Sequence, residues 1–183
     1  LRRAKTIEDL ATAEEVTIWH VNESDRHFRY IWAPELHQIN GTWYVMCTAS
    51  RSANNVWDIR PHILGCIKGD GDPMNPDNWE MIGQVQRVPG DSAFTIFSLD
   101  MNYFESDGKH YVTWAEKPNN ISNIYIATID PEAPWQLTSE AVMLSTPQYT
   151  WERKGGTIIN EGSATFKKDG KIYISFSAAA VDE

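Results

Sequence analysis

Hydrophobic and polar residues alternate along most of this chain, a period that is typical of half-buried β-strands. Three segments share one pattern, in which a short alternating run leads to Asn-Gly or Asp-Gly, two further residues, a tyrosine and a second alternating run. They are residues 36–50 (LHQINGTWYVMCTAS), 102–116 (NYFESDGKHYVTWAE) and 164–178 (ATFKKDGKIYISFSA). Asn-Gly and Asp-Gly favour type I′ turns because both central residues of such a turn need a positive φ. The pattern therefore predicts three β-hairpins, and only residues 7–15 favour a short turn of helix.

The segments that follow the first two hairpins also correspond to each other. An apolar run, an Asp-Pro pair and a tryptophan occur in the same order at 62–68, 72–73 and 79 and again at 123–129, 130–131 and 135. Each repeat thus predicts four antiparallel strands, as in a propeller blade. An ordinary β-sandwich also spaces short strands regularly, but it gives no reason for the same turns to recur in the same order. We predict an all-β fold, organised as a β-propeller.

Alignment of the chain with this four-stranded unit predicts where the blades begin and end. Residues 1–28 form the end of one blade, 29–90 a second blade, 91–150 a third, and 151–183 the start of a fourth. Within the first segment, residues 1–5 and 16–19 are expected to form a third and a fourth strand. Because a closed propeller needs roughly four blades or more, the chain is predicted to be part of a propeller.

Composition and charge restrict the classes of partner. The chain of 183 residues contains eight Trp, seven Tyr and six Phe, which favour pleated, half-buried surfaces. Its formal net charge is −9 and its Lys and Arg residues are not clustered, so neither nucleic acid nor a membrane surface is expected as a partner. No apolar stretch approaches the ~18 residues of a membrane-spanning helix. The five histidines lack metal-ligand spacing, and we expect neither a metal nor a cofactor.

Cys47 and Cys66 fall on neighbouring predicted strands. A cross-strand disulfide and two separate buried thiols are both compatible with this placement. Two cysteines do not make a disulfide framework, so separate thiols are the favoured interpretation.

A carboxylate precedes each hairpin, on the strand expected to line the propeller axis. These acids are Glu35 in WAPE, Asp100 in SLD and Glu161 in NEG. Burying a carboxylate costs free energy unless it is paired or protonated, so each acid is either a turn residue near a strand end or part of a shared polar pocket. Recurrence on successive first strands favours the pocket, and paired carboxylates are what hydrolysis of a glycosidic bond requires. Glu152, next to Trp151, is expected to anchor a loop.

In combination, these motifs resemble glycoside hydrolase family 43. The resemblance is carried by the runs IWAPELHQINGTWYV, SLDMNYFESDGKHYVTWAE, NIYIATIDPEAPWQL and YTWERKGGTIINEG with the following DGKIYISFSA. LRRAKTIEDLATAEEVTIW also resembles the end of the first blade in the arabinofuranosidase-like branch of that family. The similarity extends over essentially the whole chain. It implies a five-bladed β-propeller enzyme that acts on arabinofuranosides and xylosides.

The resemblance also implies roles for individual residues. Glu161 matches the general acid of the family, and Asp100 matches the aspartate that tunes the pKa of the acid and holds the sugar. Trp32 resembles the aromatic wall beside the bound sugar, whereas Glu35 is expected to be structural. Ser163 stands where the family usually has a proline.

The general base of the family lies on the first strand of the first blade, which this chain lacks. The resemblance therefore implies an inverting hydrolase of arabinose- or xylose-containing polysaccharide, extracellular or periplasmic, whose base is missing here and which turns over poorly as this chain alone. A non-catalytic propeller that binds carbohydrate or protein through its tryptophans is the alternative. Tryptophan content does not separate the two, because aromatic faces stack on sugars in both.

Overall fold

The computed structural model describes residues 1–21, 29–52 and 54–180, which form β-strands and short 3-10 turns. The strands are β1 Arg29–Ile39, β2 Thr42–Ser50, β3 Ile59–Cys66, β4 Trp79–Gln84, β5 Ser98–Ser106, β6 Lys109–Glu116, β7 Ile121–Asp130, β8 Ala133–Leu137, β9 Val142–Ser145, β10 Ile158–Lys168 and β11 Lys171–Ala178. The turns are η1 Glu8–Ala11, η3 Val56–Asp58, η4 Pro76–Asn78, η5 Pro118–Asn120 and η6 Thr150–Gly156. The all-β prediction is confirmed, and η1 lies within the segment expected to be helical.

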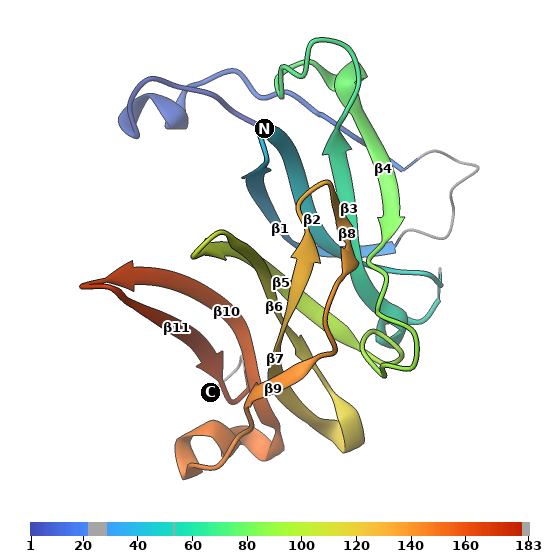
Figure 1. Ribbon diagram of the computed structural model, residues 1–183, viewed down its shortest axis with the longest axis vertical. Helices are drawn as coiled ribbons and strands as arrows, with labels where there is room; N and C mark the ends of the chain where they lie inside the picture. Colours follow the sequence, from blue (N-terminus) through green and yellow to red (C-terminus); the bar gives the residue numbers. More distant parts are fainter. Residues whose placement is uncertain (22–28, 53, 181–183) are drawn as a thin grey trace.

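The strands form two neighbouring groups (Figure 1). In the first, β1 to β4 pair in chain order. In the second, β5, β6 and β7 pair in order, and the β10–β11 hairpin joins β7 through a short parallel pairing of Ile158 and Ile159 with Ile121 and Ser122. Strand β5 contacts both β1 and β10, so the first strands of the three predicted hairpins are neighbours in space. This arrangement is consistent with part of a propeller; the exact blade boundaries stay a prediction.

All three predicted hairpins form, and each turns where the sequence indicated. The turns are Asn40-Gly41 between β1 and β2, Asp107-Gly108 between β5 and β6, and Asp169-Gly170 between β10 and β11. Each of these six residues has a positive φ, from 46° at Asn40 to 81° at Gly41. These turns match the right-handed twist of the strands that they connect.

Replacing Gly108 with Ala should lower the free energy of unfolding by about 1–2 kcal/mol, the cost of a left-handed backbone for a residue with a Cβ. A Cβ at Gly108 meets no atom within 4 Å, and the φ of Gly108 is 70°, so the effect comes from the backbone alone. Gly108→Asn is the matched variant and should cost less, because asparagine tolerates this region. Denaturant unfolding of both variants measures the difference, and equal stabilities would contradict the argument.

Strands β1, β5 and β10 share a β-bulge that the sequence did not reveal. In each case the first strand contains one residue more than its partner between two successive paired positions. On β1 the paired positions are Trp32 with Thr48 and Glu35 with Met46. The corresponding pairs are Leu99 with Ala115 and Asn102 with Thr113 on β5, and Glu161 with Ser177 and Ala164 with Ser175 on β10. The residue that follows the first pair has a positive φ in every case, 46° at Ala33, 54° at Asp100 and 61° at Gly162. Bulges bend a strand and redirect side chains. The same bend therefore occurs at the acid-bearing end of all three hairpins.

The prediction of strands at residues 1–5 and 16–19 is wrong. The amino group of Leu1 donates to the carbonyl of Val16 (2.6 Å), and the Val16 N–H donates to the carbonyl of Leu1 (2.8 Å), but no ladder continues from this pair. The side chains of Leu1, Ile18 and Trp19 instead pack against an apolar cluster formed by β2, β3 and β4 of the first sheet. Their apolar character reflects this packing rather than strand pairing.

Cys47 and Cys66 are separate thiols, as expected. Both are buried among the residues of the first sheet, and neither forms a disulfide. Burial raises the pKa of the Cys47 thiol to about 12, so this thiol is not a nucleophile at neutral pH.

The expected fourth strand after β7 is divided between two strands. Trp135 lies in β8, which pairs with the end of β7 at Ile129 and Asp130 and, through Gln136, forms a single parallel bridge with Gln86. β9 then pairs with the middle of β7, from Ile124 to Ile126. One long strand therefore has two short partners along the same edge.

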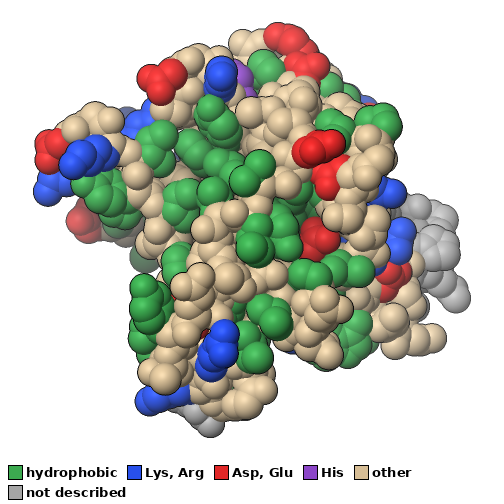
Figure 2. All heavy atoms as spheres, turned by 60° about the horizontal axis from the view of Figure 1, so that its bottom comes forward, with side chains coloured by type: hydrophobic (Ala, Val, Ile, Leu, Met, Phe, Trp, Pro, Cys, Tyr) green, Lys and Arg blue, Asp and Glu red, His purple; other side chains and the backbone are tan. Residues whose placement is uncertain are grey.

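The largest apolar core lies between the two groups of strands and includes Met46, Ile63, Met101 and Trp114. Several other large apolar side chains reach the surface, where Figure 2 shows hydrophobic patches with acidic side chains between them. They include Val142, Met143 and Leu144 on β9 and Phe166, Ile172 and Tyr173 on the β10–β11 hairpin. Among the described residues, no helix has the length and apolar character needed to cross a membrane.

Candidate active site

The bulges of β5 and β10 bring Asp100 and Glu161 to one place. Asp100 occupies the positive-φ position of the β5 bulge, and its Oδ2 accepts a hydrogen bond from the Gly162 N–H at 3.0 Å. Glu161 directly precedes Gly162. Among the described residues, the carboxyl group of Glu161 receives no hydrogen bond, so it remains available to a ligand. A Cβ at residue 162 would lie 3.1 Å from Ser177 Oγ and 3.9 Å from Asp100 Oδ2, so glycine is what permits this close approach.

The two carboxyl groups are electrostatically coupled. Burial raises the pKa of Glu161, the charge of Asp100 raises it further, and the charge of Lys117 partly opposes both. Burial also raises the pKa of Asp100; the Gly162 N–H works against this rise, while the charge of Glu35 adds to it. The raised pKa lets Glu161 keep its proton to higher pH, which is the property that a general acid needs, whereas the Gly162 N–H favours the charged form of Asp100.

The three acids nevertheless occupy different register positions. Glu161 corresponds to Trp32 and Leu99, which open the bulges of the other two strands. Asp100 lies one residue further along, and Glu35 lies at the position of Asn102. The recurring carboxylates are therefore not copies of one structural position, although they face a common region.

Glu35 links neighbouring strands. Its Oε2 accepts a hydrogen bond from Asn102 Nδ2 at 2.6 Å and lies 3.0 Å from His37 Nε2. Asn102 in turn accepts from the Thr165 hydroxyl at 3.4 Å, so the chain of contacts crosses from β1 through β5 to β10. A carboxylate with these bonds is well suited to holding the three first strands in position, in keeping with a structural role.

Ser163, which stands where the resemblance leads us to expect a proline, lies in the interior. It is 2% exposed, and its hydroxyl donates to Thr113 Oγ1 on β6 at 2.9 Å. A buried hydroxyl is costly unless it is hydrogen-bonded, and Thr113 satisfies this one. The bond ties β10 to β6 two residues beyond Glu161. Serine here therefore helps to fix the strand that carries the acid.

Trp32 lies on β1 at the register position that Glu161 has on β10. Its side chain is 41% exposed, and its carbonyl accepts a hydrogen bond from the Thr48 hydroxyl at 3.1 Å. The backbone is thus held by β2, while the ring is open to a ligand.

Glu152 anchors the loop before β10 and offers no free carboxylate. Its Oε2 accepts from the backbone N–H groups of Gln148 (2.5 Å) and Tyr149 (2.6 Å), and its Oε1 accepts from Asn160 Nδ2 (3.1 Å). Burial alone would raise the pKa of Glu152, but these hydrogen bonds outweigh it and lower the pKa. A hollow of about 300 Å³ lies beside it, lined by residues of β9, η6 and β11. Neither Asp100 nor Glu161 lines that hollow, which therefore lacks an acid for catalysis.

Sequence reasoning missed two groups near the acids. Lys117 follows β6 and acts on Glu161 through its charge, and its Nζ lies 5.5 Å from the centre of the Trp57 ring. Neither residue stands in a motif, and their proximity depends on loops from different sheets. Within the described ranges, no three His, Cys, Asp or Glu side chains gather as a metal site would require.

Known proteins provide an independent comparison. Residues 1–183 match glycosyl hydrolases family 43. The whole chain is 38% identical to an extracellular exo-α-(1→5)-L-arabinofuranosidase from Streptomyces chartreusis and 35% identical to α-L-arabinofuranosidase B from Pyricularia oryzae. Its fold superposes over its full length on the crystal structure of an α-L-arabinofuranosidase from Lactobacillus brevis, with a TM-score of 0.85 and 35% identity.

The chain spans only part of these relatives. It covers 53% of the Streptomyces chartreusis protein, 36% of the Pyricularia oryzae protein and 56% of the Lactobacillus brevis structure. The match to the family extends from residue 1 to residue 183. The chain therefore belongs to glycosyl hydrolases family 43.

Proposed function

We propose that the protein carrying this chain hydrolyses α-L-arabinofuranosidic linkages by an inverting acid/base mechanism, with β-xylosidic linkages as the second candidate. The observation that carries the proposal is the meeting of Asp100 and Glu161 at neighbouring bulges, with the pKa of both carboxyl groups raised. Membership of the family and the names of the relatives support arabinose as the sugar. The chain covers 53% of the S. chartreusis relative and 36% of the P. oryzae relative, so this activity is proposed for the whole protein.

In this mechanism each residue has one role. Glu161 protonates the oxygen of the departing sugar, for which it must be in the acid form when substrate binds. Asp100 stays charged, keeps the pKa of Glu161 high and accepts hydrogen bonds from sugar hydroxyls. Trp32 stacks against the bound sugar. These groups position the sugar and supply the proton.

The base that activates water must lie on the opposite face of the sugar, roughly 6.5–9.5 Å from the acid. Glu35 is the other carboxylate whose charge reaches Asp100, but Asn102 and His37 already occupy its Oε2, so we do not assign the base to it. We propose instead an aspartate on the first strand of a preceding blade. No cofactor enters the mechanism, and the substrates are arabinose- or xylose-containing oligosaccharides and polysaccharides. Two Streptomyces relatives are named extracellular, which supports action outside the cell.

Proton NMR of the first product tests both the activity and its stereochemistry. The full natural chain that carries these residues should release β-arabinofuranose first from an α-L-arabinofuranoside, before mutarotation mixes the anomers. Early release of the α-anomer would contradict inversion. Binding of arabino-oligosaccharide without any release of arabinose would favour the non-catalytic, carbohydrate-binding propeller.

A further inference from the structure

A tryptophan that no motif singled out stands at the acid-bearing end of the first sheet. Trp57 lies in η3, the short turn that connects β2 to β3, and 62% of its surface is exposed. Single exposed apolar residues are common and by themselves mean little. What distinguishes Trp57 is how firmly its turn is held and what lies beside its ring.

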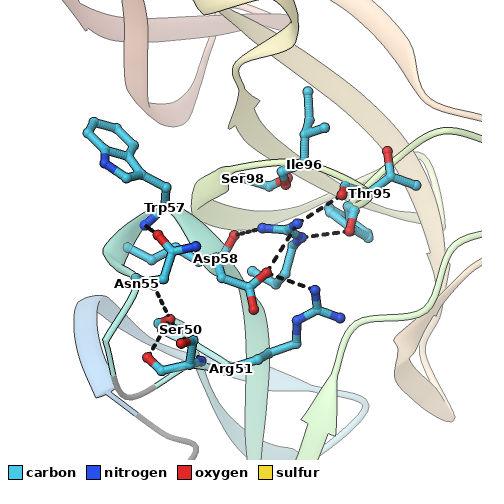
Figure 3. A network of polar contacts seen from close by, with 12 residues as sticks. Ser50, Arg51, Asn55, Trp57, Asp58, Thr95, Ile96 and Ser98 are labelled. Carbon is cyan, nitrogen blue, oxygen red and sulfur yellow. Dashed lines mark hydrogen bonds and ion pairs between the residues drawn. The ribbon is translucent and has the colours of Figure 1, made fainter.

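The turn around Trp57 is fixed by a network of polar contacts (Figure 3). The Trp57 N–H donates to Asn55 Oδ1 at 3.0 Å, and the Ser50 hydroxyl donates to the carbonyl of Asn55 at 2.6 Å. On the other side of the turn, Asp58 accepts from Arg51 at 2.8 Å. In Figure 3 the indole of Trp57 points away from this network. The backbone is therefore held while the ring projects outward.

A buried arginine connects this turn to the segment that leads into β5. Arg60 is 5% exposed and lies 3.5 Å from Asp58. It donates from Nε to the carbonyl of Phe94 and from Nη2 to the carbonyl of Thr95, both at 2.8 Å. Hydrogen bonds from a charged donor are among the stronger ones, so the two segments are tightly coupled. Trp57 thereby has a fixed place relative to the strand that carries Asp100.

The Trp57 ring contacts two residues that flank strands of the second sheet, Phe97 before β5 and Lys117 after β6. The ring of Phe97 is tilted against it by 51° at a centroid distance of 5.3 Å. Lys117 Nζ lies 5.5 Å from the centre of the Trp57 ring, and the Lys117 N–H donates to the carbonyl of Phe97 at 3.1 Å. Together these contacts form an aromatic surface, made by Trp57 and Phe97, with the Lys117 ammonium group over the tryptophan ring. More than half of the tryptophan stays open to solvent.

An apolar cluster connects this surface to the strands that carry the two acids. Phe97 precedes Asp100 by three residues, and it packs with Val56 and Phe176 on one apolar cluster that contains Leu99. Phe176 precedes Ser177, the pairing partner of Glu161. The cluster therefore runs from the turn that carries Trp57 to the strands that carry Asp100 and Glu161. The charge of Lys117 also acts on the pKa of Glu161, so the ammonium group is within electrostatic reach of that carboxyl group.

We propose that Trp57 and Lys117 form the subsite for the departing sugar, with the ring of Trp57 stacked on that sugar and Lys117 donating to one of its hydroxyls. The inference rests on the proposed function, because a general acid must stand beside the leaving oxygen and the departing sugar must lie on the side of Glu161. Trp57 is 62% exposed, and Lys117, whose charge acts on Glu161, lies over its ring. Trp32, on β1, serves the sugar that is retained. In this arrangement Trp57 binds the departing sugar and Trp32 binds the retained sugar.

The alternative is that Trp57 only covers Phe97 and the cluster below. The two interpretations differ in their substrate dependence. Loss of a cover lowers stability and impairs all substrates alike, whereas loss of a leaving-group subsite impairs only substrates with a sugar to bind there.

The test uses the full natural chain and two substrates that share the same retained sugar. These are an α-(1→5)-linked arabinofuranosyl disaccharide and methyl α-L-arabinofuranoside, whose leaving group has no ring to stack. Trp57→Ala should lower kcat/KM for the disaccharide about tenfold or more and change that for the methyl glycoside less than twofold. Trp57→Phe keeps an aromatic face and should retain much of the disaccharide activity. Ile7→Ala, a truncation of an apolar side chain that is 82% exposed on the first turn, is the control and should change neither.

The outcomes separate this inference from the proposed function. Equal losses on both substrates, or no loss on either, overturn the subsite while leaving the hydrolase assignment standing. A wild-type protein that cleaves neither substrate overturns the hydrolase assignment, and the subsite falls with it. A thermal melt run on each variant shows whether an equal loss comes from unfolding.

Discussion

Glu161→Gln should lower kcat for an arabinofuranosyl oligosaccharide by about 10²- to 10⁴-fold, the usual contribution of a general acid. Glutamine has the shape of glutamic acid but has no proton to give to the leaving oxygen. Substrate binding should stay near that of the unchanged protein, because the side chain receives no hydrogen bond from the described residues and its replacement disturbs none. Steady-state kinetics measures the first effect, and calorimetric titration with the same oligosaccharide measures the second.

Substrates with different leaving groups test this prediction most directly. A dinitrophenyl arabinoside leaves without protonation, so Glu161→Gln should impair its hydrolysis far less than that of the oligosaccharide. Glu105→Gln removes an exposed glutamate from β5 and serves as the matched control, with no expected change on either substrate. Equal losses for good and poor leaving groups would remove Glu161 from the role of acid. Loss of binding in parallel with activity would count against that role as well.

The elements that the sequence predicted are those set by local rules. Asn-Gly and Asp-Gly encode the hairpin turns because few other pairs accept two positive φ values in succession, and all three turns form as expected. Once the hairpins are placed, the strands before them follow, and the acids at the start of those strands follow in turn. The meeting of Asp100 and Glu161 was therefore predictable from spacing together with the resemblance to the family.

What the sequence did not reveal depends on contacts between distant segments. Ala33 and Asp100 have left-handed backbones although they are not glycine, so their residue types did not indicate the bulges. Of the three bulge positions, only the one at Gly162 has a residue type that could have indicated a bulge. The apolar residues of 1–5 and 16–19 indicated burial correctly but not strand pairing, because pairing needs a partner that alternation alone does not identify. Trp57 contacts Phe97 and Lys117, which lie 40 or more positions away along the chain.

Asp100→Asn should move the alkaline limb of the pH profile of kcat/KM to lower pH. Glu161 must be protonated to act, so its pKa sets that limb. The negative charge of Asp100 raises the pKa of Glu161, next to the larger effect of burial. Removing the charge lowers that pKa, and Glu161 then loses its proton at a lower pH. At neutral pH the substitution leaves a smaller fraction of the acid form.

The total loss of kcat/KM at neutral pH should be about 10²-fold. Part of this loss comes from the smaller protonated fraction of Glu161, and the rest comes from weaker hydrogen bonds to the sugar. Asparagine suits the site structurally, because it tolerates the φ of 54° and can still accept the Gly162 N–H. Lowering the pH should reverse the loss that comes from deprotonation of Glu161 but not the loss that comes from weaker hydrogen bonds to the sugar.

Asp107→Asn provides the matched control, because it removes a charge from the turn at the far end of the same strand and Asn-Gly forms the same type of turn. Its pH profile should coincide with that of the unchanged protein. An alkaline limb that stays in place in Asp100→Asn would show that burial alone sets the pKa of Glu161, and Asp100 would then act on the sugar only. A limb that moves to higher pH would reverse the sign of the coupling and exclude Asp100 as the group that keeps the acid protonated.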